Sequence, residues 1–257
     1  MSRRNFARIK STAERLLDEG HVQKAIPHLI TLLEANPRAQ QDFSINMLAR
    51  RGMPVLPRLI KVIKRPKNQF QLCGALAAIH EGQFRLSGKD LLSVLSRVDH
   101  KNPEVAEAAI YIAADHEAGL FAIQRALNHK NKSVRHDAIE ALADYHGLNG
   151  FGDAAASVNA LHRIYETPSF RNRKSELFEA LGKLAHPSSI GFLVGSLADK
   201  VHSESSQIAL VRLAAKNNFN RRAVENALRG AGNTRNESSD IAKDLLVSLP
   251  TLLGPGN

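Results

Sequence analysis

The chain has 257 residues, of which 43% are hydrophobic and none is tryptophan, so it can bury a core built mainly from Leu, Ile, Val and Ala. Its single cysteine, Cys73, excludes an internal disulfide framework and any metal site made of several cysteines, and one free thiol is typical of a reducing compartment. The formal net charge is +10, and residues 1–101 hold 18 Lys and Arg against 8 Asp and Glu, so the excess lies at the N-terminal end.

The N-terminal residues predict a protein that stays in the cytoplasm. Positive charge near residue 1 is followed by no apolar run, unlike in a secretory signal. No stretch approaches the roughly 18 consecutive apolar residues of a membrane span. We therefore expect a cytoplasmic protein with no signal peptide and no membrane span.

Residues 1–39 are predicted to form a pair of antiparallel helices. Apolar residues recur at helical spacing in residues 6–17 and again in 25–33, and Gly20 stops the first helix. The segment LLDEGHVQKAIPHLITLLEANP resembles half of a tetratricopeptide repeat. We expect this pair to cap the N-terminal end of the fold.

The rest of the chain predicts further helix pairs of irregular length. In the pair that begins near residue 69, Ser87 is expected to cap the second helix, with Asp90 three residues on as its capping-box partner. A last single helix precedes a tail, 251–257, that is expected to fray. The predicted pairs cover residues 40–68, 69–102, 103–130, 131–168, 173–200 and 205–233.

Residues 131–147, NKSVRHDAIEALADYHG, show the clearest repeat pattern. A polar turn precedes apolar residues at helical spacing, and the small alanines among them allow a neighbouring helix to approach closely. This stretch resembles a HEAT repeat, and residues 175–199 resemble the turn and second helix of bacterial HEAT-like repeats.

No segment alternates between apolar and polar residues like a strand, so the sequence predicts an all-α fold. The HEAT resemblance implies a curved right-handed α-solenoid of about seven antiparallel helix pairs, in which each pair buries its apolar stripe against its neighbours. It also implies a single domain over residues 1–257.

A cluster of cations in the second helix pair is the candidate binding site. On a helical wheel Arg58, Lys61 and Arg65 fall on one side, and the apolar residues gather on the other. No acid lies between Asp42 and Glu81, so 38 consecutive residues carry only positive charge, whereas a solubilising face more often mixes signs. The HEAT resemblance implies that these cations line a concave surface. The cluster comprises Arg50, Arg51, Arg58, Lys61, Lys64, Arg65 and Lys67.

Other basic residues extend this charge or form smaller patches. Extra basic groups could come from Arg3, Arg4, Arg8 and Lys10 at the N-terminus and from Lys89 and Arg97 in the third pair. A solvated cation is the usual interpretation at turns and helix starts, so the patches there count only if they line the same groove; they are Arg171, Arg173, Lys174, Arg221 and Arg222.

Two kinds of partner fit a basic surface on a helical scaffold. The first hypothesis is a non-enzymatic scaffold that binds an acidic protein or peptide. The alternative is a nucleic-acid-binding solenoid that holds phosphates by charge pairing and counterion release. DNA glycosylases with HEAT-like solenoids resemble the chain in architecture and charge. Their aromatic lesion pocket has few candidates here, because the chain has no Trp and only 3 Tyr.

The sequence predicts no metal, no cofactor and no enzymatic activity, and a hydroxylase-like enzyme with His-Glu metal ligands is the remote alternative. Deoxyhypusine hydroxylase, another HEAT-like family, binds two irons through His-Glu pairs, and the VRHDAIEALADY segment around His136 resembles its motif with Asp in place of Glu. His80-Glu81 and His116-Glu117 fall near helix ends, out of register with His136, whereas a di-iron site needs several such pairs to converge. No HExxH, zinc-spaced cysteine set or phosphate-binding glycine loop is present. Cys73 is predicted to be a small buried core residue.

Overall fold

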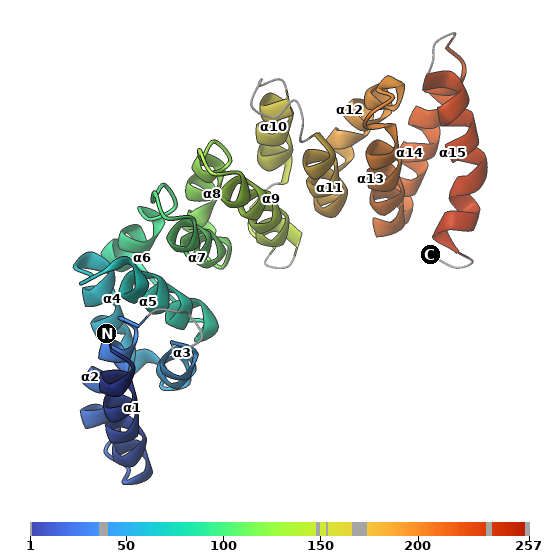
Figure 1. Cartoon of the computed structure of the whole chain (residues 1–257). Coiled ribbons are helices and arrows are strands. Elements are labelled where there is room, and N and C mark those ends of the chain that lie inside the picture. The colour runs from blue at the N-terminus through green and yellow to red at the C-terminus, as the bar shows by residue number, and fades with distance from the viewer. Residues whose placement is uncertain are drawn as a thin grey trace. The chain divides into compact units, whose positions relative to one another are not determined.

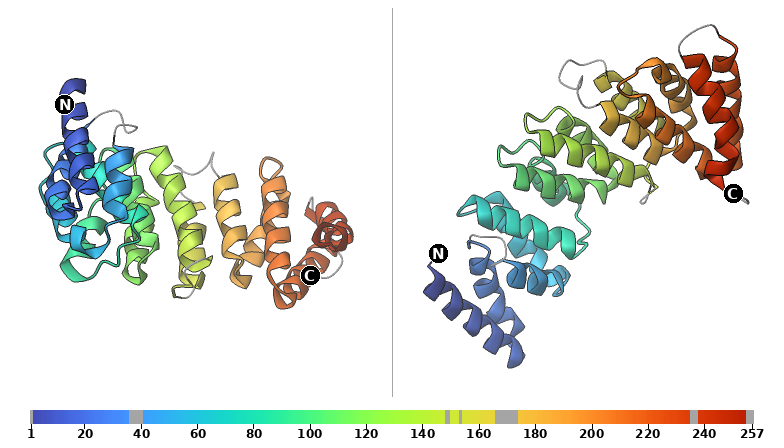
Figure 2. Two further views of the ribbon diagram at one scale, coloured as in Figure 1. Left: turned by 90° about the horizontal axis from the view of Figure 1, so that it is seen from below. Right: turned by 45° about the vertical axis from the view of Figure 1, so that its right-hand side comes forward.

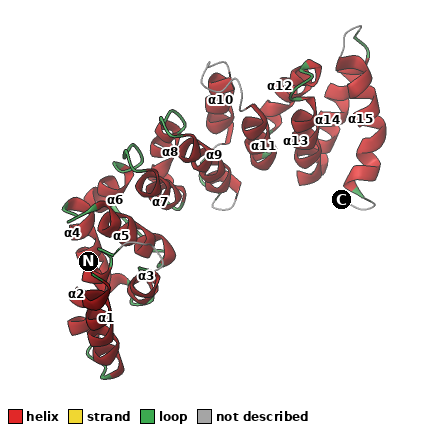
Figure 3. Cartoon of the chain, viewed as in Figure 1, coloured by secondary structure: helices red, strands yellow, loops and turns green. Residues whose placement is uncertain are grey.

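The computed structural model describes residues 2–35, 41–147, 150–152, 154–165, 174–234 and 238–254. Every regular element within these ranges is a helix, which confirms the predicted all-α class (Figure 3). None of the described helices combines the length and the apolar character needed to cross a membrane. The chain divides into two compact parts, unit 1 (Met1–Ala138) and unit 2 (Ile139–Asn257). The single domain expected over residues 1–257 stays a prediction.

The helices of unit 1 lie where the apolar periodicity predicts them (Figure 1). The last of them, α9, begins in unit 1 and ends in unit 2. They are α1 (Arg3–Asp18), α2 (Val22–Leu32), α3 (Asp42–Ala49), α4 (Leu56–Lys64), α5 (Gln69–Glu81), α6 (Gly88–Leu95), α7 (Pro103–Ala114), α8 (Leu120–Ala126) and α9 (Lys132–Gly147), with short 3-10 helices η2 (Met53–Val55) and η3 (Glu117–Gly119).

Helix α5 forms the centre of unit 1. Its residues from Gln71 to Ile79 are all buried, as expected of a helix that is apolar or small on every side. It packs against α3 and α7, and α4 packs against α5 and α6. Figure 2 shows the helices of unit 1 from two further directions. Cys73 lies in this core, as predicted.

Two prolines lie at the start of the α4 region. Pro54 lies in η2, and Pro57 occupies the first turn of α4. Proline is tolerated in both places because the N–H that it lacks has no intrahelical acceptor at a helix start. Gly52 precedes the turn with φ 70°, a conformation that favours glycine.

Unit 2 is also helical throughout its described residues. After the end of α9 it contains α10 (Ala154–Tyr165), α11 (Lys174–Leu184), α12 (Ile190–Gly195), α13 (Ser203–Lys216), α14 (Asn218–Gly232) and α15 (Ser238–Leu253), with 3-10 helices η5 (Pro187–Ser189) and η6 (Ser196–Ala198).

Close helix contacts and a continuous apolar stripe hold unit 2 together. A Cβ on Gly182 of α11 would lie 2.9 Å from the Cα of Ala209 of α13, so small residues let these helices approach. The stripe of α15 runs through Ala242, Leu245 and Leu249 to Leu253, which is buried. The helix therefore includes residues 251–253, which the sequence predicted to fray; 255–257 lie outside the described residues.

A histidine packed among the aromatic residues of unit 2 makes stability depend on pH. The His162 ring stacks on Phe192 at 4.3 Å, and its Nε2 has no hydrogen-bond partner among the residues described. Burial lowers the pKa of His162 below its ordinary value of 6.5. Between pH 6.5 and that lower value the unfolded chain therefore binds more protons than the folded chain does. The free energy of unfolding thus falls as the pH falls through this window.

Replacing His162 by Phe should reduce this pH dependence, because phenylalanine can stack on Phe192 but has no proton to bind. The expected result in urea unfolding at pH 7.5 and 5.0 is a smaller loss of stability in the variant than in the unmodified chain. An equal loss in both proteins would show that His162 does not contribute to the acid sensitivity.

Candidate binding surface on helix α4

Helix α4 has one buried face and one cationic face, as its sequence predicts. Leu59, Ile60 and Ile63 are 0–3% exposed and face the core. Lys61 and Lys64 are exposed, and Arg65 is exposed directly after the helix, where it is the C-cap residue. Cations near a helix C-terminus interact favourably with its dipole. Two surface hollows flank this cationic face.

The α2–α4 hollow has a volume of about 380 Å³ and lies where α2 meets α4 and the start of α5. Apolar residues form much of its wall, and four cations and one carboxylate surround them. Its lining residues are Pro27, Ile30, Thr31, Glu34, Arg58, Lys61, Val62, Arg65, Lys67 and Gln71.

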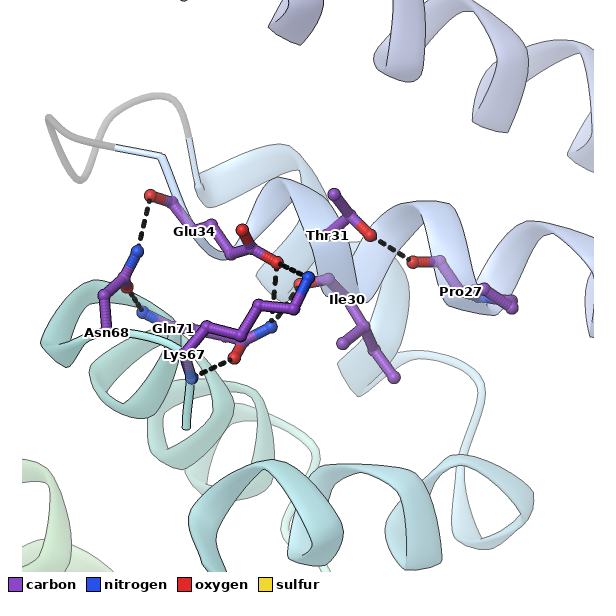
Figure 4. Close-up of polar contacts among 7 residues, drawn as sticks. All are labelled: Pro27, Ile30, Thr31, Glu34, Lys67, Asn68 and Gln71. Atoms are coloured by element: carbon purple, nitrogen blue, oxygen red, sulfur yellow. Dashed lines mark hydrogen bonds and ion pairs between the residues drawn. The ribbon is translucent and has the colours of Figure 1, made fainter. Parts of the chain in front are cut away.

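A polar network closes one end of the α2–α4 hollow (Figure 4). The Glu34 carboxylate lies 2.8 Å from Lys67 Nζ and accepts a hydrogen bond from Gln71 Nε2 at 3.3 Å. The Gln71 side chain accepts from the Lys67 N–H at 3.0 Å, and the Asn68 side chain accepts from the Gln71 N–H at 2.8 Å. Glu34 thus neutralises Lys67. The sequence did not indicate this pair, because the two residues are 33 positions apart.

The α4–α6 hollow lies on the other side of the same helix and has a volume of about 410 Å³. Asp90 of α6 lies in it and binds Lys64 Nζ at 2.9 Å. The predicted capping box is therefore wrong in its contacts. Ser87 is the N-cap residue of α6, but its side chain makes no capping hydrogen bond, and the Asp90 carboxylate binds Lys64 instead. The lining residues are Pro57, Ile60, Lys61, Lys64, Arg65 and Asp90.

Lys61 and Arg65 line both hollows and form the ridge between them. No hydrogen bond or ion pair joins either side chain to any residue that the structure describes. The two nearby carboxylates, Glu34 and Asp90, are already bound to Lys67 and Lys64. The ridge therefore keeps its positive charge, although acids from flanking helices approach α4 on both sides.

Arg58 has a partner that a proline in α2 creates. Pro27 lies inside α2 and has no N–H, so the carbonyl of Gln23, four residues earlier, lacks its usual helical donor. The Arg58 guanidinium donates to this carbonyl at 3.4 Å. Arg58 thus links α4 to α2 and still lines the hollow.

Arg65 differs from the arginines at the equivalent positions of α6 and α8, which bind a carbonyl of another helix. Arg97 and Arg125 each stand two positions after a buried pair, Val94-Leu95 and Ala122-Ile123, as Arg65 does after Val62-Ile63. Arg97 donates to the Ile63 carbonyl of α4 at 2.7 Å, and Arg125 donates to the Leu95 carbonyl of α6 at 3.1 Å. Each bonds to the second residue of the buried pair in the helix two positions earlier in the chain. Arg97 thus connects α6 to α4, and Arg125 connects α8 to α6.

The corresponding carbonyl for Arg65 already has another donor. The last buried pair of α2 is Leu32-Leu33, so the equivalent acceptor is the Leu33 carbonyl. Gln41 Nε2 donates to that carbonyl at 2.7 Å and to those of Ala35 and Phe70 at 2.8 and 3.0 Å. A buried side-chain amide thus caps the end of α2, and Arg65 is left on the surface.

The other cations of the α4 face are specific to this helix. In the register that aligns the three arginines, Lys61 corresponds to Ser93 in α6 and Phe121 in α8. Lys64 likewise corresponds to Ser96 and Gln124. The packing of α6 and α8 therefore needs no charge at these positions, and the charge of Lys61, which pairs with no described acid, is free for a binding role.

The structure does not bring all seven predicted cations together. Arg50 and Arg51 follow α3 and line neither hollow, whereas the other five cations each line at least one of them. The candidate surface thus consists of Arg58, Lys61, Lys64, Arg65 and Lys67 and is called the α4 surface below. The expectation that it is concave stays a prediction.

Several of the further basic residues have partners of their own. Lys10 pairs with Glu14 at 3.6 Å, and Arg221 pairs with Glu225 at 3.2 Å. Lys174 donates to the Tyr165 hydroxyl at 2.9 Å, and this hydrogen bond raises the pKa of Lys174. Arg171 and Arg173 lie outside the described residues.

The His-Glu pairs take part in local structure. His116 Nε2 accepts from the Leu86 N–H at 2.9 Å, so its other ring nitrogen donates to the Ile112 carbonyl at 2.8 Å. His80 lies in the last turn of α5, 3.5 Å from Asp115. Among the residues whose positions are described, no three His, Cys, Asp or Glu side chains are grouped so that they could hold a metal ion.

Comparison with known proteins assigns no function to the α4 surface. No family model and no curated protein sequence matches the chain. The chain is similar to the crystal structure of an engineered protein, with 14% identity and a TM-score of 0.40, over 88% of this chain and 97% of that chain. Similarity at this level supports no conclusion about fold or function.

Proposed function

We propose that the chain is a non-enzymatic binding protein and that its α4 surface holds an acidic segment of a partner protein. The observation that carries the proposal is the ridge of Lys61 and Arg65, which lines two hollows and is neutralised by no described acid. Carboxylates bind such cations through charge-assisted hydrogen bonds. Glu34 and Asp90 already bind Lys67 and Lys64 in this way within the chain itself.

The walls of the hollows favour a peptide over nucleic acid. Pro27, Ile30 and Val62 supply apolar surface in the α2–α4 hollow, and Pro57 and Ile60 supply it in the α4–α6 hollow. An acidic peptide that also carries apolar side chains would use both kinds of surface, as protein interfaces do.

A HEAT-like solenoid is the architecture that we propose to carry this surface. Two features support it within unit 1: α5 packs against helices two positions away in both directions, and Arg97 and Arg125 connect α4, α6 and α8 in series. In such folds each repeat contacts only its neighbours, so the surface of one helix can vary without disturbing the next.

A binding titration tests the proposed function. We expect the purified chain to bind a fluorescent eight-residue peptide of repeated Glu-Leu-Glu-Glu about 10-fold more tightly than the same peptide with Gln in place of Glu, because only the former pairs with the ridge. At about 200 mM salt the acidic peptide should retain more affinity than a 20-base-pair DNA duplex, since phosphate contacts weaken steeply with salt.

Two outcomes would contradict this. If the duplex bound more tightly than the acidic peptide at about 200 mM salt, nucleic acid would be the partner and not a peptide. If the Glu and Gln peptides bound with equal affinity, Lys61 and Arg65 would not contribute to the binding site.

A further inference from the structure

Three turns of unit 1 repeat the same Lys-Asn pair. The turns precede α5, α7 and α9, and they contain Lys67-Asn68, Lys101-Asn102 and Lys130-Asn131. In each turn the asparagine side chain accepts a backbone N–H of the helix that follows, at 2.8, 2.9 and 2.8 Å respectively. An Asn in this place caps a helix start. The lysine before it is exposed in all three turns.

Further hydrogen bonds connect the second and third turns. His100 and His129 each accept, through Nδ1, the N–H of the asparagine two residues later, at 3.1 and 3.0 Å. Since Nδ1 of His129 is then an acceptor, its Nε2 carries the proton and donates to the His100 carbonyl at 3.2 Å. These two turns are therefore held side by side.

The first of these lysines belongs to the α4 surface, and the other two stand at the same position in the next two turns of this kind. Lys67 lines the α2–α4 hollow and is paired with Glu34. Lys101 and Lys130 are exposed, and neither side chain makes a hydrogen bond or ion pair with the described part of the chain. The nearby carboxylate of Asp99 is bound to Arg125 at 2.9 Å. Lys67, Lys101 and Lys130 are called the lysine row.

The dimensions of the row suit an extended peptide. Packed helices lie about 8–10 Å apart, so three successive turns span about 20 Å. An extended chain rises about 3.3 Å per residue, so about six residues cover that distance and about three separate one lysine from the next.

We propose that the acidic partner is an extended segment of about ten residues that starts in the α2–α4 hollow and continues along the lysine row. This inference rests on the proposed function and adds the length and the path of the ligand. A segment with an acid at about every third residue would pair with the ridge and then with Lys101 and Lys130, the two lysines of the row that have no ion-pair partner among the described residues. A short acidic peptide would fill the hollow and leave Lys101 and Lys130 unused.

Peptides of two lengths test the row separately from the hollow. The probes are fluorescent peptides with one and with three copies of Glu-Leu-Glu-Glu, four and twelve residues long. We expect the double variant Lys101→Glu/Lys130→Glu to bind the twelve-residue peptide about 10-fold more weakly than the unmodified chain. Its affinity for the four-residue peptide should stay within about 2-fold, because exposed charge pairs act only where the ligand reaches them.

A matched variant controls for net charge. Arg85→Glu/Lys216→Glu changes the formal charge by the same amount at two exposed positions, and it should leave both affinities within about 2-fold. Equal affinity of the Lys101→Glu/Lys130→Glu variant and the unmodified chain for the longer peptide would overturn the lysine row and leave the proposed function intact. Failure of both peptides to bind the unmodified chain would overturn the proposed function itself.

Discussion

Reversing the charge of Arg58, Lys61 and Arg65 together is expected to weaken binding of the eight-residue acidic peptide about 100-fold. The three side chains lie on one face of α4 and line the α2–α4 hollow. The variant Arg58→Glu/Lys61→Glu/Arg65→Glu replaces three attractive contacts by three repulsive ones. An exposed ion pair contributes about 0.2–1 kcal/mol, so three lost attractions and the added repulsion together give about 2.7 kcal/mol, or 100-fold in Kd.

The fold should survive this triple change. Lys61 and Arg65 make no hydrogen bond or ion pair with the described residues, and Arg58 makes one long hydrogen bond to the Gln23 carbonyl. None of the three belongs to the buried face of α4, which Leu59, Ile60 and Ile63 form. Circular dichroism and thermal unfolding should therefore match the unmodified chain closely, apart from about 0.3–1 kcal/mol for each acid placed at the C-terminal end of a helix.

The control for the triple change reverses three exposed cations elsewhere, Arg85, Lys216 and Arg222. Both triple variants lower the formal charge by the same amount, but the control leaves the ridge intact and should bind within about 3-fold of the unmodified chain. A third variant with Gln at positions 58, 61 and 65 removes attraction without repulsion and should lie between the two. Equal losses in the ridge and control variants would mean that the peptide senses only net charge and that the α4 surface is no site.

The sequence predicted the helices well because each helix is indicated by the spacing of apolar residues within its own segment. Apolar residues recur along each segment at the period of a helix, so the buried face of α4 and the positions of α1 and α2 followed from the residues alone. The cationic face of α4 followed for the same reason, since residues three and four apart share a side. The Lys-Asn turns were also present in the sequence, but their equivalence became clear only from the shared capping bonds.

The polar partners of the site could not be predicted in this way. Glu34 and Asp90 lie outside the segment between Asp42 and Glu81 that contains no acid, yet packing brings them to Lys67 and Lys64. Proximity of this kind depends on which helices pack together, and periodicity does not specify it. Gln41 is a second example, because its side chain is the donor to three carbonyls near the ends of α2 and at the start of α5. Buried polar groups require such partners, but the sequence does not name them.

The turn between α7 and α8 depends on one glycine for a steric reason. Gly119 is buried in η3, and a Cβ built on it would lie 1.8 Å from the carbonyl oxygen of Ala113 and 2.6 Å from its carbonyl carbon. Its φ of −79° is open to any residue, so the requirement comes from close approach of the backbone alone. The clashing atoms belong to the backbone of α7, which cannot move aside as a flexible side chain can.

Gly119→Ala should therefore destabilise the chain by about 3 kcal/mol or more, because the start of α8 must move away from α7 to admit the methyl group. For a chain of this size that corresponds to a fall of about 6–12 °C in the Tm followed by circular dichroism. Gly230→Ala makes the same chemical change inside α14, where nothing lies within 4 Å of the added Cβ, and it should raise stability by about 0.5–1 kcal/mol. The Gly119 variant should also loosen α8, which carries the Arg125 bond to α6. If Gly119→Ala unfolded at the same temperature as Gly230→Ala, the close approach of α7 and η3 would be refuted.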